Sequence, residues 1–349
     1  MTACSTLGRT TLVTGAAGFV GSHVARHLSL SGYPVRVLLR SSSNPQAVED
    51  LPVERVEGDL RDAASLDRAL RGVNRVIHVA ADYRLWCRDP REIYENNVTG
   101  TRNLLEAAGR AGVERFVYTS TVATIAVHRP GSLPNEETNA GIDEMIGHYK
   151  RSKFIAEREA LRAAANGLPV VIVNPTAPIG PGDWKPTPTG RIILDFLNGK
   201  MPAYVDTGLN FVAVEDVAAG HELAAERGRI GERYILGGRN LTLKNILDAL
   251  AKISGRPAPR VRLPHAVALA AAYGDQVYSR VVGREPQIPV EGVRMSRHKM
   301  WVESSKASRE LGYQNGSIEA ALERAVRWYE DHGYVNSARG ARVAHPAAA

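Results

Sequence analysis

Short apolar runs alternate with longer helical patterns along the first 180 residues of the chain. Several runs are apolar throughout and rich in β-branched residues, which is typical of parallel strands buried on both faces. The expected strands are residues 10–14, 35–39, 53–57, 75–79, 115–119 and 169–174, and the expected helices are residues 19–31, 64–71, 91–111 and 149–166. This alternation predicts an α/β fold of the Rossmann type, a doubly wound parallel sheet with helices on both faces.

The pattern changes after residue 174. Residues 175–190 are rich in proline and glycine and predict an irregular loop at a lobe boundary. Beyond it we expect helices at residues 191–199, 217–226, 243–254, 266–282 and 318–332, and a strand at residues 210–214. We therefore expect a dinucleotide-binding domain over residues 1–180 and a smaller, mixed substrate-binding lobe over residues 181–335, with residues 210–227 returning to the first domain. The tail, residues 336–349, lacks an apolar period and is expected to be disordered.

Composition narrows the class of protein. With 349 residues, 44% of them hydrophobic, the chain can bury a large core. No apolar run is long enough to predict a transmembrane helix, and the N-terminus lacks a leader pattern. Cys4 and Cys87 are too few for a disulfide framework or a cysteine metal site, so we expect a cytoplasmic protein without a bound metal.

The net charge of +7 comes from basic residues, mostly Arg, that are spread along the chain. A solvated Arg-rich surface explains this pattern better than nucleic-acid binding does. A modest attraction to anionic cofactors or to an anionic membrane surface stays open.

A glycine-rich turn follows the first expected strand. Gly15 permits a tight turn, Gly18 lets the backbone approach a pyrophosphate, and Gly21 lets the following helix pack closely against the strand. The helix N-terminus then offers free N–H groups to phosphates. The predicted dinucleotide-binding residues here are Gly15, Ala17, Gly18, Phe19, Val20 and Gly21.

The end of the second expected strand indicates which dinucleotide is bound. A carboxylate there would bind the ribose 2′-hydroxyl of NAD, but the chain has Leu39 and Arg40, and no acid before Glu49. Arg40 suits a 2′-phosphate, so the sequence favours NADP, with NAD as the alternative. Asp59, after the third strand, is a candidate acceptor for the adenine amino group.

Tyr149 and Lys153 are four residues apart at the start of an expected helix and therefore share one face. An ammonium group near a phenol is expected to lower the phenol pKa, which would let Tyr149 exchange a proton with a substrate alcohol or carbonyl. Thr121 supplies a hydroxyl at the end of the fifth strand, on the edge where such folds bind ligands.

Together these residues resemble the extended short-chain dehydrogenase/reductase superfamily. The resemblance covers about residues 10–330 and is carried by residues 14–21, 59–60, 78–81, 97–101, 119–121, 149–153 and 211–218. It implies catalytic roles for Thr121, Tyr149 and Lys153, with Asn97 positioning the lysine through water. It further implies cofactor contacts at Leu60, Val79, Ala80, Ala81, Lys153, Pro175 and Thr176.

Within the superfamily, residues 33–40 and 173–176 resemble the dihydroflavonol-reductase-like branch. Residues 81–86 and 174–183 are similar to the bacterial hopanoid-associated sugar epimerase family. The resemblance implies two enzymatic alternatives, a net NADPH-dependent carbonyl reduction and a redox-neutral sugar epimerisation. A non-catalytic cofactor-binding module is a remote third. A dehydratase is disfavoured, because Val122 and Ala123 stand where that pattern has acidic residues.

Other expectations are less specific. Tyr83, Trp86 and Trp184 are candidate substrate contacts, with ring packing as the structural alternative for each. The Ala-rich helix at 266–282 is expected to pack in the core, although a dimer or membrane-surface role stays open. By resemblance, the helices at 91–111 and 149–166 form a homodimer interface. The substrate is a small molecule whose identity the spacing does not encode.

Overall fold

The structure is a computed structural model that describes residues 8–126 and 132–336. The predicted disordered tail lies outside the described residues, apart from Asn336. The backbone N–H of Asn336 donates to Asn198 Oδ1 at 3.0 Å.

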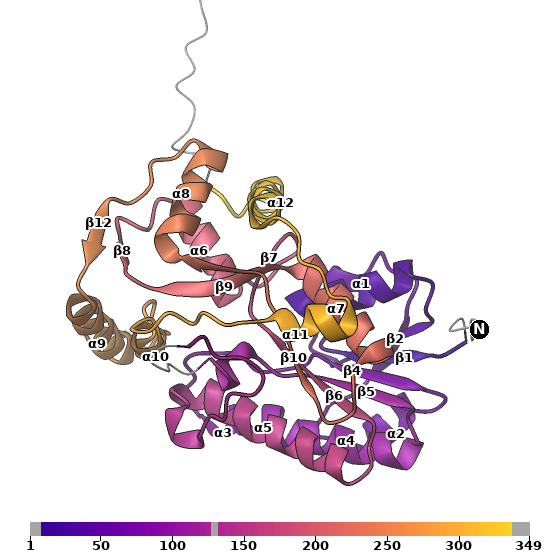
Figure 1. The fold of residues 1–349 in the computed structure, drawn as a ribbon. Coiled ribbons are helices and arrows are strands. Elements are labelled where there is room, and N and C mark those ends of the chain that lie inside the picture. Colours follow the sequence, from indigo (N-terminus) through magenta and orange to yellow (C-terminus); the bar gives the residue numbers. More distant parts are fainter. Residues whose placement is uncertain (1–7, 127–131, 337–349) are drawn as a thin grey trace, which may run out of the picture.

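A parallel sheet of seven strands forms the centre of the molecule, in the order β10-β6-β5-β4-β1-β2-β3 (Figure 1). Its strands are β1 (Thr11–Thr14), β2 (Val35–Leu39), β3 (Glu54–Glu57), β4 (Arg75–His78), β5 (Arg115–Thr119), β6 (Val170–Pro175) and β10 (Arg233–Leu236). The predicted Rossmann fold is confirmed. The strand order reverses between β1 and β4, the place where open α/β sheets bind ligands.

Helices cover both faces of this sheet (Figure 1). On one face lie α1 (Phe19–Leu30), α7 (Val214–Arg227) and α11 (Ser305–Leu311), and on the other α2 (Ala63–Ala69), α4 (Gly100–Ala111) and α5 (Gly147–Ala165). Successive strand residues enter opposite cores: Val13 packs with the α1 side and Leu12 with the α4 side. Burial on both faces explains why interior strands such as β1 and β6 are largely apolar, whereas the edge strand β3 is mostly exposed and contains two glutamates.

The helix expected at residues 91–111 is interrupted. It consists of α3 (Arg91–Tyr94), a π-helical segment (Glu95–Thr99) and α4. Such π-bulges accompany functional sites and leave no trace in apolar periodicity, because the flanking helical pattern continues on both sides. The bulge carries Asn97, one of the predicted site residues.

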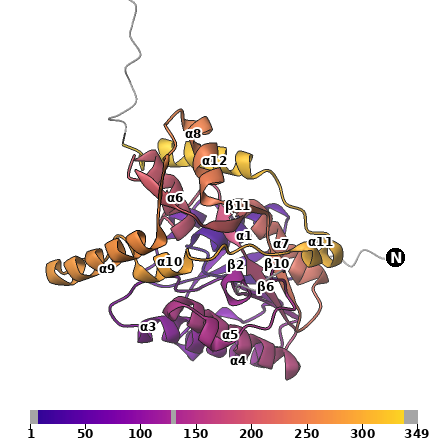
Figure 2. The same ribbon diagram turned by 60° about the vertical axis from the view of Figure 1, so that its left-hand side comes forward.

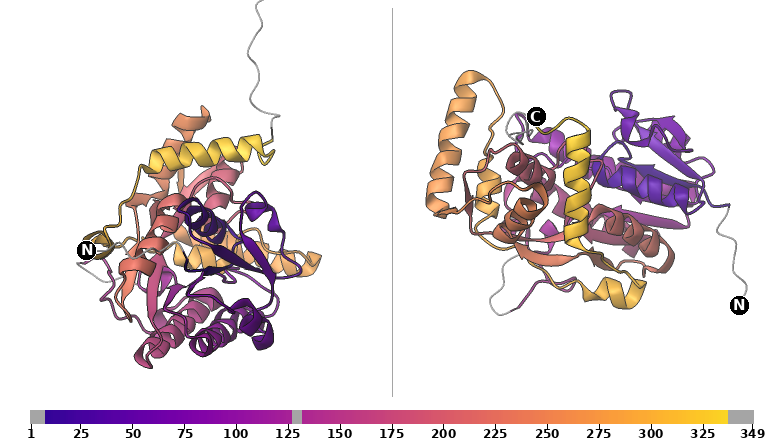
Figure 3. Two further views of the ribbon diagram at one scale, coloured as in Figure 1. Left: turned by 90° about the vertical axis from the view of Figure 1, so that its right-hand side faces the viewer. Right: turned by 90° about the horizontal axis from the view of Figure 1, so that it is seen from above.

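A smaller lobe contains a mixed three-stranded sheet, in the order β11-β9-β7, and a pair of strands, β8 and β12. These strands are β7 (Ala177–Ile179), β8 (Ala203–Val205), β9 (Gly208–Ala213), β11 (Arg239–Thr242) and β12 (Val261–Leu263). Three helices, α6 (Pro188–Leu197), α8 (Leu243–Ser254) and α12 (Ile318–Asp331), enclose its core with residues such as Leu197, Leu247 and Leu322. Figure 3 shows this lobe beside the Rossmann sheet from two further sides.

Two expectations for this lobe are wrong. The segment 175–190 is not an irregular loop throughout, since it contains β7 and the first turn of α6. The strand expected at residues 210–214 is β9, which pairs with β7 and β11 rather than with the Rossmann sheet; β10, which was not predicted, joins that sheet instead. Among the described residues, the five strands that were not predicted are β7, β8, β10, β11 and β12, and each has at most four residues, too few to show a period. The division near residue 180 stays a prediction.

Helix α9 (His265–Val282) stands away from the body of the protein, with α10 (Val290–Met295) between them (Figure 2). The expectation that it packs in the core is wrong, because Ala272 and Ser279 are its only buried residues. Periodicity cannot distinguish a buried face from an exposed one when both contain small or apolar residues. Within the described ranges, no helix is long and apolar enough to cross a bilayer.

The contact between α1 and β1 tolerates no side chain at Gly21. A Cβ added there would lie 2.1 Å from Gly15 O, whereas one added at Gly109, in α4, would have its nearest neighbour, Leu168 Cδ1, at 4.0 Å. Gly21→Ala should lower the free energy of unfolding by about 1–3 kcal/mol or more, because the helix must move off the strand. Gly109→Ala should be neutral or raise it by up to ~1 kcal/mol, since alanine is the better helix former. Urea unfolding measures both, and equal effects would contradict the packing described here.

Candidate active site

Four neighbouring strands end at the carboxyl edge of the sheet, where several predicted site residues follow them. Thr14 ends β1, His78 ends β4, Thr119 ends β5 and Pro175 ends β6, and these strands are neighbours in the sheet. Parallel strands present their carboxyl ends at one edge, so the segments that follow them gather around a common space.

The glycine turn is held tightly against the end of β4. Gly15 has φ +75°, and a Cβ added to it would lie 2.6 Å from Ala80 N. The Gly18 N–H donates to Gly15 O at 2.9 Å, and Gly18 is exposed at the start of α1. No side chain caps α1, and its first turn holds no acid. The N-terminus of α1 is therefore open to an anion.

The segment after β4 lies against the same turn. The Val79 and Ala80 N–H groups both donate to Thr14, to its carbonyl and its hydroxyl respectively, each at 3.3 Å. Ala81 follows and is half-buried. On the far side, the Thr176 N–H donates to Leu236 O at 3.2 Å, which fixes the predicted Pro175–Thr176 pair at the end of β6.

A buried histidine that sequence reasoning did not single out connects three elements at this edge. His78 Nδ1 lies 2.7 Å from Thr14 Oγ1, and its Nε2 lies 3.0 Å from Thr101 Oγ1 in α4. Burial lowers the pKa of His78 to about 3, and the charge of Lys153 adds to this effect. The neutral ring therefore ties β1 to β4 and α4 at neutral pH. The only indication of this role in the sequence was that His78 belongs to residues 78–81, one of the segments that carry the superfamily resemblance.

The three predicted catalytic residues lie together. The Lys153 side chain, on α5, is buried, and its Nζ donates to Thr119 O at 2.8 Å and lies 4.5 Å from the centre of the Tyr118 ring. Tyr149, one turn earlier, is hydrogen-bonded to the Thr121 side chain. The strand end and the helix start thus bring two hydroxyls and an amine to one place.

Burial changes the proton affinities of these groups. It lowers the pKa of Lys153 from 10.5 to about 7, and the charge of Glu157 opposes this shift. Burial raises the pKa of Tyr149 above 10.0, while the hydrogen bond with Thr121 lowers it. The expected lowering of the Tyr149 pKa by Lys153 is wrong for this structure, because desolvation outweighs the other effects. The phenol is therefore protonated at neutral pH.

Asn97 connects the loop after β4 to α5, the helix that carries Tyr149 and Lys153. Its side-chain amide donates to Asp82 O at 2.8 Å and to Ser152 Oγ at 2.9 Å, and its Oδ1 accepts from the Asp82 N–H at 2.7 Å. Ser152 directly precedes Lys153. Asn97 therefore holds the helix that carries Lys153 rather than contacting the lysine itself.

The predicted adenine end of the site contains an ion pair between Asp59 and Arg61. Asp59 forms two hydrogen bonds with the Arg61 side chain, at 3.0 and 2.7 Å, and the pKa of Asp59 falls to about 2, chiefly through Arg61 and in smaller part through the charge of Arg40. Arg40 itself is exposed at the end of β2. Leu60 lies beside them, and its carbonyl accepts from Asn103 Nδ2 at 2.9 Å.

The candidate substrate residues come from two segments, the loop after β4 and the loop before α6. Tyr83 and Trp86 are half-buried in the loop after β4, and the Tyr83 hydroxyl lies 3.5 Å from Lys185 O. The ring of Trp184 packs at 4.9 Å from both Trp328 and His332, at the end of α12. Ring packing thus accounts for Trp184, and substrate contact stays a prediction for all three candidates.

Comparison with known proteins agrees with this arrangement. A family model described as "NAD dependent epimerase/dehydratase family" matches residues 11–237. The chain belongs to this family. It is 48% identical to a putative dihydroflavonol 4-reductase of Synechocystis, over 93% of this chain and 96% of that protein. It is 38% identical to sterol demethylase protein B of Methylococcus capsulatus, over 93% and 100%. A nucleoside-diphosphate-sugar epimerase from Pseudomonas aeruginosa superposes with a TM-score of 0.79 at 30% identity, over 94% and 99%.

Members of the NAD-dependent epimerase/dehydratase family are enzymes that use a nicotinamide dinucleotide, and the residues present fit such a cofactor. The turn from Gly15 to Gly18 leaves backbone where a Cβ would obstruct a pyrophosphate, and the uncapped N-terminus of α1 faces the same space. The buried Lys153 amine and the hydroxyls of Thr121 and Tyr149 lie at the adjoining strand ends, where the reacting end of a dinucleotide belongs.

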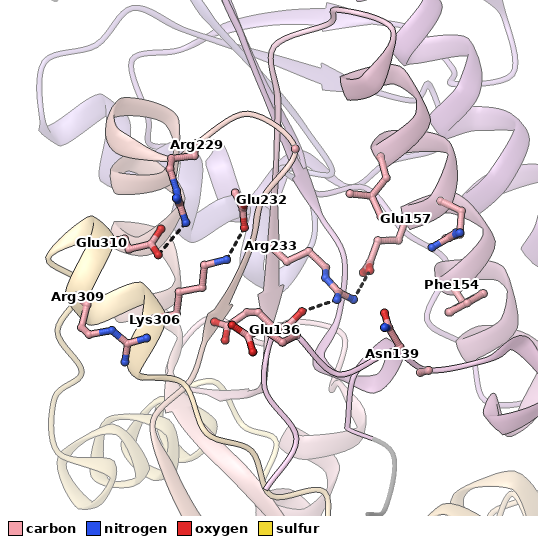
Figure 4. Close-up of a pocket in the computed structure, with 15 residues that line it drawn as sticks. Glu136, Asn139, Phe154, Glu157, Arg229, Glu232, Arg233, Lys306, Arg309 and Glu310 are labelled. Atoms are coloured by element: carbon pink, nitrogen blue, oxygen red, sulfur yellow. Dashed lines mark hydrogen bonds and ion pairs between the residues drawn. The ribbon is translucent and has the colours of Figure 1, made fainter.

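Sequence reasoning missed a buried carboxylate beside the predicted catalytic residues. Glu157, one turn after Lys153, accepts from Ser120 Oγ, from Thr124 Oγ1 at 2.9 Å and from Asn174 Nδ2 at 2.9 Å. It also lines a cavity of about 510 Å³ at the outer edge strand β10, where Arg233 Nη1 lies 3.4 Å from it (Figure 4). That cavity is separate from the glycine turn. A glutamate four residues after a lysine gave no distinctive signal by itself.

The lowered pKa of Lys153 predicts a specific dependence of stability on pH. In the unfolded chain this amine regains its ordinary pKa of 10.5, so between about pH 7 and 10.5 the unfolded chain binds a proton that the folded protein has lost. The contribution of Lys153 to the free energy of unfolding therefore rises with pH across that window. Lys153→Met should remove this rise, whereas Lys200→Met, at an exposed site, should retain it. Urea unfolding at a series of pH values measures the slopes, and parallel curves for wild type and Lys153→Met would refute the shift.

Proposed function

We propose that the protein is an NADPH-dependent reductase that delivers a hydride to a carbonyl carbon and a proton to its oxygen. The observation that carries the proposal is the placement of the Tyr149 phenol, hydrogen-bonded to Thr121 and one turn from the buried Lys153 amine, at the carboxyl edge that adjoins the glycine turn. A reductase needs a proton donor at this place, and a phenol whose pKa is raised by burial is in the donating form at neutral pH.

The residues divide the chemistry among them. The reduced nicotinamide supplies the hydride when it is bound. The Thr121 hydroxyl donates a hydrogen bond to the carbonyl oxygen, and Tyr149 transfers its proton to that oxygen as negative charge develops there. Lys153, with a pKa of about 7, exchanges protons readily near neutral pH and restores the proton of Tyr149. Asn97 is a positioning residue that acts through Ser152.

The preference for NADP rests on charge at the end of β2. No acidic residue occupies the position that would bind a ribose 2′-hydroxyl, and Arg40 is exposed there. Because the charge of Arg40 reaches Asp59 at the end of β3, the two strand ends face a common space. A guanidinium beside this space would pair with a 2′-phosphate through charge-assisted hydrogen bonds.

The substrate belongs, in this proposal, to cytoplasmic lipid or lipid-linked sugar metabolism, including hopanoid metabolism. The similarity to sterol demethylase protein B over the whole of that protein supports a lipid substrate. The similarity of residues 81–86 and 174–183 to the hopanoid-associated family supports the same assignment.

A redox-neutral epimerase is the second candidate, favoured by the similarity to a nucleoside-diphosphate-sugar epimerase. In such an enzyme Tyr149 first accepts a proton and later returns it, so its phenolate must form at neutral pH. The similarity to a putative dihydroflavonol 4-reductase, at 48% identity over 93% of this chain, favours net reduction over this alternative. Dehydration is disfavoured because Val122 and Ala123, both buried, follow Thr121 where an acidic pair would be needed.

We also propose a homodimer formed through α4 and α5, which pack side by side in one helical layer (Figure 1). Both present exposed residues to solvent, among them Arg102 and Glu106 of α4 and Arg158 of α5. This face lies on the outer side of the sheet layer, so dimerisation there leaves the glycine turn accessible.

Removing the proton donor tests the reaction. Tyr149→Phe should lower kcat for any carbonyl compound that the wild-type protein reduces with NADPH by roughly 10²- to 10⁴-fold, because the developing oxyanion receives no proton. The dissociation constant for NADPH, measured by fluorescence titration, should stay nearly unchanged. Tyr94→Phe, which removes a phenol outside the catalytic group, serves as the control. Wild-type activity in Tyr149→Phe would exclude the mechanism.

Removing the Arg40 guanidinium at the end of β2 tests the proposed preference for NADPH over NADH. Arg40→Ala should reduce the preference for NADPH over NADH, taken as the ratio of their dissociation constants, by roughly 10- to 100-fold, since a charge-assisted hydrogen bond is lost. Arg26, on α1, carries a guanidinium that pairs with Asp50 away from the end of β2. Arg26→Ala should therefore leave the ratio unchanged. An unchanged ratio in Arg40→Ala would remove the basis for NADP, while hydride transfer with NADH would remain possible.

A further inference from the structure

Helix α9 presents an apolar face to solvent. Exposed residues without charge recur along it at helical spacing, and we call them the α9 stripe: Val267, Ala270, Ala271, Gly274, Val277, Tyr278 and Val281. Val277 is 63% exposed, Tyr278 59% and Val281 82%. At about 100° per residue, these positions fall within roughly a third of the helix circumference. A surface helix of a globular protein ordinarily points such a stripe toward the core.

The opposite face attaches α9 to the protein. Asp275 accepts from Arg284 Nη2 at 2.7 Å and from the Ile288 N–H at 2.9 Å, which folds the following segment back against the helix. His265 Nε2 donates to Val293 O, in α10, at 2.6 Å. The attachment is therefore made mostly by polar and small side chains. Tyr278 of the α9 stripe contributes through its ring, whose centre lies 5.2 Å from the Arg284 guanidinium, whereas Val277 and Val281 stay exposed. Figure 3 (right) shows α9 at one margin of the molecule.

Positive charge surrounds the stripe. Residues 256–299 carry eight Arg and Lys but only three Asp and Glu, so most of the chain's net charge of +7 lies in this region. Exposed Arg260 and Arg262 precede α9, and exposed Arg280 lies in its last turn. Two copies of the chain meeting through this region would oppose like charges, which disfavours a second copy as the occupant. An apolar stripe flanked by cations is complementary to an anionic lipid surface.

We propose that α9 is an interfacial helix that docks the protein on the surface of an anionic lipid bilayer. The stripe enters the boundary between headgroups and acyl chains, and the flanking arginines contact lipid phosphates. The helix lies in the plane of the surface, since it is too polar to cross the bilayer.

The docked helix would have a fixed relation to the catalytic residues. α10 packs against α9, and its Glu291 accepts from the backbone N–H of His148, next to Tyr149. Gly292 of α10 lies against Leu85, in the loop that carries Tyr83 and Trp86. Docking would therefore place this loop and the start of α5 on the membrane side of the protein.

Co-sedimentation of the full chain with vesicles tests the proposal. The wild-type protein should bind vesicles of phosphatidylcholine mixed with phosphatidylglycerol, bind weakly to phosphatidylcholine alone, and lose affinity as salt is raised. Val277→Ser/Val281→Ser should weaken binding about tenfold or more, because two apolar side chains no longer enter the bilayer. Arg262→Gln/Arg280→Gln should weaken it about fivefold per charge removed. Leu30→Ser, at a residue 80% exposed on α1, should bind as the wild type does.

Two further measurements make the outcome decisive. NADPH affinity and circular dichroism should match the wild type in every variant, which shows that each has folded. Light scattering without vesicles should give the same mass for wild type and Val277→Ser/Val281→Ser. The proposal is overturned if folded wild type ignores anionic vesicles, if the serine variant binds as tightly as wild type, or if that variant dissociates a dimer.

Discussion

The buried amine of Lys153 is the constraint on which the catalytic arrangement depends. An ammonium group is costly to bury, and the protein meets this cost by lowering its pKa to about 7 and by giving it the carbonyl of Thr119 as an acceptor. That hydrogen bond joins α5 to the end of β5. It consequently fixes where Tyr149, one turn earlier, stands relative to Thr121, two residues beyond the strand.

Other buried polar contacts hold the same helix from three sides. Asn97 ties it to the loop after β4 through Ser152, and Glu157 ties it to β5 and β6 through Ser120 and Asn174. The Glu291 carboxylate, in α10, accepts a hydrogen bond from the backbone N–H of His148 at the start of α5. The contacts of Asn97 and Glu157 satisfy polar groups that would otherwise be buried without a partner, so the network both stabilises the helix and limits its movement. A membrane docked on α9 would act on this helix through α10.

The sequence predicted the parts of the site that depend on local pattern. The strands on either side of the switch point, the glycine turn and the Tyr149–Lys153 pair all follow from a short stretch of chain. β10 and β7 were not predicted because each is too short to show a period. The roles of His78 and Glu157 arise from neighbours distant in the sequence. The exposure of α9 could not be predicted either, because an apolar stripe has the same period whether it faces a core or a membrane.

The proposed net reduction requires NADPH that exchanges with solution, so the decisive measurement is which nicotinamide dinucleotide co-purifies with the protein. Freshly purified protein would be denatured before and after dialysis, and the released dinucleotide identified by mass spectrometry. We expect NADP in its oxidised or reduced form, bound in exchange with solution and removed by dialysis. Stoichiometric NAD⁺ that survives dialysis would contradict it, because an enzyme that retains its oxidised cofactor returns the hydride to its own substrate.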